Sequence, residues 1–232
     1  VRSIDKDAPE SIHLCDFPVV DETAIDKETS DAAKEGLKRT YESICLSKER
    51  RNPACPDTGW PIFYFKVGNK CEIEGGFVEL ENAARRAVAR ATELGYLRAT
   101  MKPPLTGYDP GNNIGMNIPD FTYQFVDGDS IELSYAAKGG GSECFGGTRH
   151  RVVAFADGMA GIKKFVLDSF ISSSKAGAIC PPNILGVGIG GTANVAANLA
   201  KEAACLRRIG SHHPEPQIAQ LEKELTEAIN SL

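Results

Sequence analysis

The chain has 232 residues, of which 42% are hydrophobic and 25% charged, and its formal net charge is −5. This composition is typical of a soluble globular protein of one domain or two small ones. The acidic balance argues against a nucleic-acid partner, because binding a phosphate backbone requires a basic face. No apolar run approaches the ~18–20 residues of a membrane span, and the N-terminus lacks the apolar segment of a signal peptide. We therefore predict a cytoplasmic protein that binds neither nucleic acid nor membrane.

The first half of the chain predicts an irregular N-terminal segment over residues 1–20, followed by alternating helices and strands. Apolar residues recur near a period of 3.6 in two stretches, and a β-rich run lies between them. We expect a helix over 21–51, in which Cys45 belongs to the core, a buried strand over 62–67 and a helix over 77–95.

The second half predicts a β-hairpin and then three more helices. Two strand-like runs, 118–126 and 130–137, flank Asp127-Gly128-Asp129, which is a hairpin turn signal. Further elements are expected as a helix over 161–173, a strand over 184–189, and helices over 193–204 and 215–232. The predicted fold class is α+β: a mixed, largely antiparallel sheet with a β-hairpin, packed against several amphipathic helices in one domain over 21–232.

The cysteines are distributed in a way that excludes a compact local metal motif. Their number is odd, and none forms a Cys-x-x-Cys pair, as a disulfide framework or a zinc ribbon would require. They are Cys15, Cys45, Cys55, Cys71, Cys144, Cys180 and Cys205. Any metal site must therefore be assembled from segments that are distant in the sequence.

Two of these cysteines lie in stiff, proline-rich loops next to predicted strands. Cys55 stands between Pro53 and Pro56, and Cys180 is followed by Pro181-Pro182. Proline cannot continue a helix and restricts its neighbours to extended conformations, so both loops are held rigid. A rigid loop can present a thiolate.

Three consecutive glycines follow the second predicted hairpin strand, in Lys138-Gly139-Gly140-Gly141-Ser142-Glu143. Without Cβ atoms, their backbone N–H groups can converge on an anion such as a small carboxylate, with Lys138 and Glu143 at either rim. A plain loop is the alternative, since short glycine motifs have low specificity. Arg98 has two interpretations as well: a solvated cation after a helix C-terminus, or a clamp for a carboxylate.

A second glycine motif, Gly186-Val187-Gly188-Ile189-Gly190-Gly191, matches the GxGxxG pattern of dinucleotide-binding proteins. No acidic residue ends a following strand about 20 residues later, so we reject that interpretation; no Lys-Ser/Thr follows, which rejects a P-loop. For His212 and His213, two adjacent side chains beside Pro214, we favour a structural role over metal binding.

Taken together, these motifs make the sequence resemble the iron–sulfur hydro-lyase family of class I fumarases and L(+)-tartrate dehydratase, specifically the alpha subunit or N-terminal domain. The resemblance runs from about Asn52 to Ser231. It rests on the order and spacing of Ala54-Cys55-Pro56-Asp57-Thr58-Gly59, Tyr96-Leu97-Arg98, Lys138 to Glu143, Cys180-Pro181-Pro182, Gly186 to Thr192 and Arg208 to Pro214.

The resemblance implies a [4Fe-4S] cluster held by three cysteine thiolates, with one iron open to the substrate. It assigns Cys55 and Cys180 as two ligands; the third family cysteine lies in a segment after Leu232 and is not present in this sequence. Asp57 resembles the family aspartate beside the cluster, which is placed to polarise the substrate hydroxyl or shuttle a proton. The implied substrate-binding residues are Pro56, Asp57, Arg98, Lys138, Gly139, Gly140, Gly141 and Glu143.

This sequence departs from the family pattern at two positions. Pro56 stands where the family usually has Gln, and Cys144 stands where Asn is common. The loss of an amide at position 56 leaves the choice among dicarboxylates open. Cys144 is either filler or an oxidation-sensitive thiol.

The resulting hypothesis is the cluster-bearing alpha subunit of a hydro-lyase acting on fumarate/L-malate or on L-tartrate. We expect an alpha-type domain without its C-terminal extension, a β subunit or C-terminal catalytic domain as partner, and an α2β2-type oligomer. The alternative is a non-catalytic module that binds an organic acid or nucleotide phosphate through its glycine-rich loop.

Overall fold

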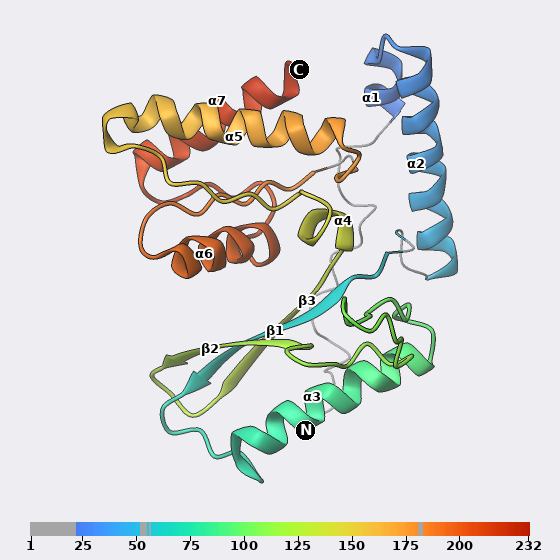
Figure 1. The fold of residues 1–232 in the computed structure, drawn as a ribbon, viewed down its shortest axis with the longest axis vertical. Helices are drawn as coiled ribbons and strands as arrows, with labels where there is room; N and C mark the ends of the chain where they lie inside the picture. Colours follow the sequence, from blue (N-terminus) through green and yellow to red (C-terminus); the bar gives the residue numbers. More distant parts are fainter. Residues whose placement is uncertain (1–21, 52–54, 56, 181–182) are drawn as a thin grey trace.

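The computed structural model describes residues 22–51, 55, 57–180 and 183–232. The predicted irregular segment 1–20, Cys15 and Pro56 lie outside the described residues. The helices are α1 (Glu22–Lys27), α2 (Asp31–Arg50), α3 (Gly76–Glu93), α4 (Gly140–Glu143), the 3-10 turn η2 (Phe155–Asp157), α5 (Gly158–Lys175), α6 (Ala193–Cys205) and α7 (Pro216–Asn230). The strands are β1 (Trp60–Gly68), β2 (Asp120–Val126) and β3 (Ile131–Lys138). The α+β class is confirmed (Figure 1).

The predicted helix over 21–51 divides into α1 and α2, because local hydrogen bonds break it. The Glu28 carboxylate accepts the backbone N–H groups of Thr29 and Ser30, and the Ser30 hydroxyl accepts the Ala33 N–H as the N-cap of α2. Cys45 is exposed, so its placement in the core was wrong. The helices predicted over 77–95, 161–173, 193–204 and 215–232 are confirmed as α3, α5, α6 and α7.

The three strands form a mixed sheet in the order β2-β1-β3. β1 runs parallel to β2 and antiparallel to β3, so the predicted hairpin is wrong: β1 lies between its two arms. The turn after β2 crosses the end of β1, where Gly68 donates its N–H to the Ser130 carbonyl and Lys70 donates to the Gly128 carbonyl. A turn signal predicts a reversal of the chain, but it does not specify which strand fills the gap.

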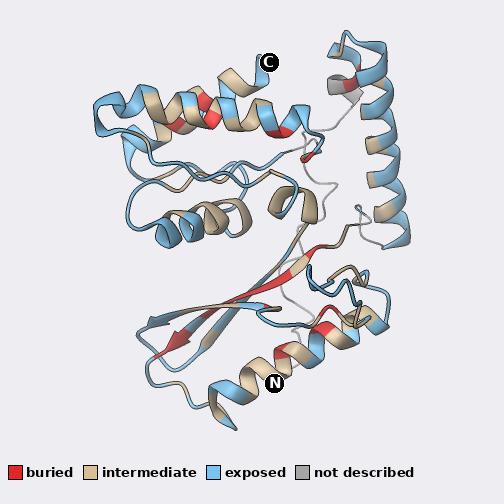
Figure 2. Ribbon diagram, in the orientation of Figure 1, coloured by how far each residue is buried: buried red, intermediate tan, exposed pale blue. Residues whose placement is uncertain are grey.

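One face of the sheet makes the main hydrophobic core. Alternate residues of β1, namely Phe63, Phe65 and Val67, pack against Ala84 and Val88 of α3. Figure 2 shows the buried residues concentrated along β1 and on the helix that covers this face. A central strand needs apolar residues on both faces, which explains why Trp60–Gly68 reads as a nearly continuous apolar run.

A second, smaller core joins α5 and α7. Val166 packs with Leu221 and Leu225, and Val187 of the extended segment 183–190 lies against them. The strand predicted over 184–189 is wrong: this segment is extended but belongs to no described ladder. No helix in the described ranges combines the length and apolar character needed to cross a membrane.

Candidate functional site

The triglycine stretch forms a turn between β3 and the one-turn helix α4. Gly139 is extended, with φ −60° and ψ 145°, and α4 begins at Gly140. The Asp57 carboxylate accepts the Gly140 N–H at 2.6 Å, as an acidic side chain does at a helix start. The loop that carries Cys55 is therefore tied to the first residue of α4.

The next glycine contacts the loop that carries the other predicted cluster ligand. A Cβ on Gly141 would lie 2.4 Å from the Ala178 carbonyl oxygen, a separation that only glycine permits. Ala178 is buried and precedes Cys180 by two residues, just as Cys55 precedes Asp57 by two. The two cysteine loops thus converge on consecutive glycines, and we call this arrangement of Gly139–Gly141 with Asp57 and Ala178 the glycine junction.

Each of the two predicted thiol ligands lies two residues from a residue of the junction, and both are accessible. Cys55 and Cys180 are free and exposed. Among the described residues, no three side chains of the His, Cys, Asp or Glu type are grouped so that they could hold a metal ion. The described part of the chain therefore has two exposed thiols on the loops that meet the glycine turn, and no complete set of metal ligands.

Arg98 lies beside the Asp57 loop because its main chain is fixed there. Its backbone N–H donates to the Thr58 hydroxyl at 2.8 Å, and its carbonyl accepts the side-chain amide of Asn113 at 2.9 Å. Asn113 is fully buried and left-handed (φ 58°), and it also accepts the Thr100 N–H at 3.1 Å. The guanidinium side chain is exposed, and is thus available to a ligand near the junction.

The rims of the glycine turn differ from the sequence expectation. Lys138 donates to the Ser142 hydroxyl within the turn. Glu143 points into the protein, where its carboxylate lies 3.3 Å from the Lys201 ammonium of α6 and its side chain is only 11% exposed. Of the amides expected to cradle a carboxylate, Gly140 already donates to Asp57, and the Glu143 N–H donates to the Gly139 carbonyl at 3.3 Å.

Sequence reasoning missed three residues that shape the site: Thr58, Asn113 and Lys201. Thr58 stands inside a motif that we singled out, and Asn113 inside a loop marked by glycine and asparagine, so both had a weak signal. Lys201 had none, because a lysine on an amphipathic helix is normally a solvated residue.

Burial changes the proton affinity of nearby groups. Desolvation raises the pKa of the Cys205 thiol, and the Glu143 carboxylate adds to this effect. Desolvation also raises the pKa of the Cys144 thiol, with further contributions from Glu143 and Asp57. Both thiols are therefore less ionised at neutral pH than a free cysteine, which disfavours reactivity at Cys144.

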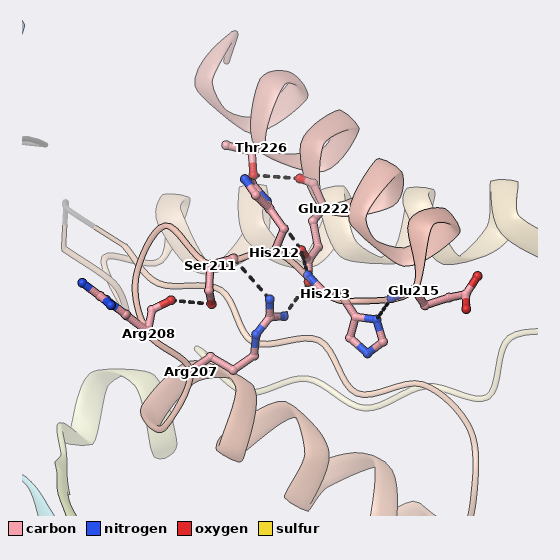
Figure 3. Close-up of polar contacts among 8 residues, drawn as sticks. All are labelled: Arg207, Arg208, Ser211, His212, His213, Glu215, Glu222 and Thr226. Atoms are coloured by element: carbon pink, nitrogen blue, oxygen red, sulfur yellow. Dashed lines mark hydrogen bonds and ion pairs between the residues drawn. The ribbon is translucent and has the colours of Figure 1, made fainter.

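The loop after α6 forms a separate polar cluster (Figure 3). Arg207 donates to Glu222 at 2.5 Å, and Glu222 also accepts the backbone N–H of His213 at 3.0 Å. The His213 Nδ1 accepts the Glu215 N–H, so this ring helps to begin α7. Figure 3 shows the Arg208 side chain directed away from Glu222.

The chain is similar in sequence to known dehydratase subunits and to a known protein family. The curated relatives are hydro-lyase subunits. A protein from Methanocaldococcus jannaschii, provisionally named L(+)-tartrate dehydratase subunit alpha, is 39% identical over 216 residues, covering 91% of this chain and 73% of the relative. The L(+)-tartrate dehydratase subunit alpha of Escherichia coli strain UTI89 is 35% identical over 208 residues, and that of strain K12 is 34% identical. Each of these alignments covers 89% of this chain and 66% of the relative.

The sequence profile described as fumarate hydratase (Fumerase) matches residues 17–232, nearly the whole chain. The chain belongs to the fumarate hydratase (Fumerase) family, a family of hydro-lyases. It covers 73% of the length of the Methanocaldococcus jannaschii relative and 66% of the length of the Escherichia coli relatives.

Proposed function

We propose that this chain is the cluster-bearing, alpha-type part of a hydro-lyase that adds water to, or removes it from, a small dicarboxylate. The observation that carries the proposal is the convergence of the Cys55 and Cys180 loops on consecutive glycines of the glycine junction. Arg98 lies near that point, because its backbone N–H donates to the Thr58 hydroxyl, and its side chain is exposed.

The donor set fits part of an iron–sulfur site. Two exposed thiols match the soft ligands that iron–sulfur clusters require. By the family resemblance, Cys55 and Cys180 would hold a [4Fe-4S] cluster together with a third cysteine thiolate. When bound, the cluster supplies Lewis acidity toward the substrate hydroxyl.

The residues of this chain would bind and orient the substrate around that centre. The Arg98 guanidinium is suited to a carboxylate, because it forms two parallel hydrogen bonds in one plane. Asp57 has one oxygen held by the Gly140 N–H, which leaves the other free to accept a proton from the substrate hydroxyl or to polarise it. Lys138 adds positive charge on the half-buried side of the turn.

The reaction we favour is reversible dehydration of L-tartrate or L-malate, with L-tartrate tested first because the curated relatives carry that name. These relatives are named as alpha subunits, so we further propose that a β-type subunit or domain completes the active site. An α2β2-type assembly follows from that proposal.

The test uses the chain co-expressed with its partner polypeptide and reconstituted anaerobically with iron and sulfide. We expect brown protein with stoichiometric iron and sulfide, and turnover of L-tartrate, L-malate or fumarate. Replacing Cys55 or Cys180 with Ser should lower activity at least about 100-fold, because a thiolate ligand is lost. Cys45→Ser is the matched control, since Cys45 is exposed on α2. Full cluster content in both serine variants at the junction would refute the assignment.

The alternative function, a module that binds nucleotide phosphate, has less physical support. A phosphate-binding loop uses its backbone N–H groups, and the Asp57 carboxylate already accepts the Gly140 N–H. Calorimetry with ATP on cluster-free protein distinguishes the two functions: tight, cluster-independent phosphate binding would favour the alternative.

A further inference from the structure

The GxGxxG motif has a use in this fold that does not involve a nucleotide. A Cβ on Gly186 would lie 2.0 Å from the Ala200 carbonyl oxygen, and one on Gly188 would lie 1.9 Å from the Ala196 carbonyl oxygen. Only glycine permits such a close approach of one backbone to another. These two glycines therefore set helix α6 directly against the extended segment 183–190.

The placement of α6 brings a cation to the glycine turn. Lys201 follows Ala200 on this helix, and its ammonium lies 3.3 Å from the Glu143 carboxylate of α4. In Figure 1, α4 lies between the end of β3 and the layer that contains α5 and α6. The ion pair thus connects the two glycine motifs, which are more than 40 residues apart in the sequence.

This ion pair differs from the others in the described part of the chain. The Glu143 side chain is 11% exposed, whereas the next most buried carboxylate in a pair, that of Glu222, is 27% exposed. The Glu143 Oε1 atom is buried and accepts no hydrogen bond from the described residues, so the Lys201 charge is what compensates it. Lys201 is 31% exposed, so the pair is partly buried; replacing Lys201 leaves a largely desolvated carboxylate without its cation, which disfavours the position of α4 that holds it there.

We propose that Lys201 is a positioning residue: through its ion pair with Glu143 it holds α4 and the glycine turn in the geometry that binds the substrate. Gly186 and Gly188 allow the close approach of α6 that places Lys201 at this position. This inference rests on the proposed function, in which the turn borders the dicarboxylate. In this proposal the GxGxxG motif fixes the position of α6, and α6 in turn aligns the turn at Gly139–Gly141. Asp57 and Ala178 restrain two sides of that turn, and Lys201 restrains the helix that ends it.

The experiment measures the local opening of the glycine turn as well as catalysis, in the complete complex with its partner. Amide hydrogen exchange is followed in a peptide spanning residues 139–147 for the wild type, Lys201→Met and Lys201→Arg. We expect exchange at least about threefold faster in Lys201→Met, because the turn opens locally, and near-wild-type exchange in Lys201→Arg. Lys163→Met is the matched control: it breaks the Lys163–Glu224 pair between α5 and α7 without touching the turn.

Catalytic measurements on the same variants separate positioning from general destabilisation. Lys201→Met should raise the KM for the dicarboxylate about tenfold or more with a smaller change in kcat, since misplacing the turn weakens substrate contacts. Lys201→Arg should restore most of the affinity. Unchanged exchange in Lys201→Met, or a KM equally raised by Lys163→Met, would overturn the inference. If Lys201→Met does not fold, Glu143→Gln replaces it, with the same expectations for exchange and KM.

The two proposals fail in distinguishable ways. A wild-type complex that turns over no dicarboxylate contradicts the proposed function, whatever the exchange data show. A wild-type complex that is active while Lys201→Met leaves exchange and KM unaltered contradicts the role of Lys201 alone.

Discussion

The sheet layer and the glycine junction are held together by different forces. Phe63 and Phe65 on β1 are nearly completely buried and pack against the aromatic rings of β2, and Val88 of α3 packs against the same cluster. Around Gly140 and Gly141, in contrast, the contacts are backbone to backbone or from a backbone N–H to a carboxylate. Apolar burial stabilises without specifying one exact geometry, whereas hydrogen bonds and close backbone contacts specify geometry and add little net stability. The difference indicates that stability resides mainly in the sheet layer and the shape of the site in the junction.

The largest effect should come from the sheet layer. Phe65→Ala removes a ring that is 3% exposed and leaves a cavity against α3 and Tyr123, so we expect a loss of about 3–5 kcal/mol in the free energy of unfolding. Phe125→Ala is the control, because Phe125 is 68% exposed on the same sheet. Urea denaturation measures both. Phe125 contacts Phe77 of α3 at the exposed end of the same layer, so equal losses for the two variants would contradict the idea that stability is concentrated in the buried part of that layer.

An intermediate effect should arise where the Arg98 segment is fixed. Asn113→Ala leaves the Arg98 carbonyl and the Thr100 N–H without their partner and places alanine at φ 58°. We expect a loss of about 2–3 kcal/mol and weaker dicarboxylate binding in the complex.

Asn117→Ala is the control for the backbone contribution. Asn117 is also left-handed, with φ 61°, but it is exposed. Only the backbone penalty should remain there, about 1 kcal/mol. If both asparagine variants behave alike, the buried amide of Asn113 has no special role.

The smallest effect should depend on pH and lies where Glu222 of α7 binds Arg207 and His213, which precede this helix. Hydrogen bonding from Arg207 lowers the pKa of Glu222 in the folded state. A carboxyl group with a lowered folded pKa stabilises the protein above its unfolded pKa, near 4.3, and loses that contribution as pH falls through the folded pKa. Glu222→Gln should therefore cost about 1 kcal/mol at pH 7, with the difference from wild type shrinking below about pH 4.

Unfolding measured against pH tests this last expectation. Glu227→Gln serves as the control, because Glu227 is 66% exposed and lies 4.0 Å from Lys223. It should be nearly neutral at every pH, as exposed ion pairs usually are. A Glu222→Gln difference that persists unchanged to pH 3 would show that the ionised carboxylate is not the stabilising group.

Local patterns in the sequence were sufficient for most of the longer helices, although they missed the break between α1 and α2 and the one-turn helix α4. The 3.6-residue period of apolar residues predicted α3, α5, α6 and α7 correctly, because the buried face of an amphipathic helix appears in the sequence as apolar residues at this spacing. The motifs also singled out the cysteine loops and the triglycine turn. The family resemblance brought these segments together, and the family profile confirms that membership.

Contacts between distant segments were decided only by the tertiary structure. The turn at Asp127-Gly128-Asp129 predicts a hairpin until β1 is known to lie between its arms, and Gly186 reads as part of a strand until α6 is seen against it. In the same way, nothing near Lys201 in the sequence indicates that it meets Glu143. The periodicity of apolar residues in the sequence indicates which residues are buried. It does not indicate which residues they contact, because those contacts depend on the packing of the whole chain.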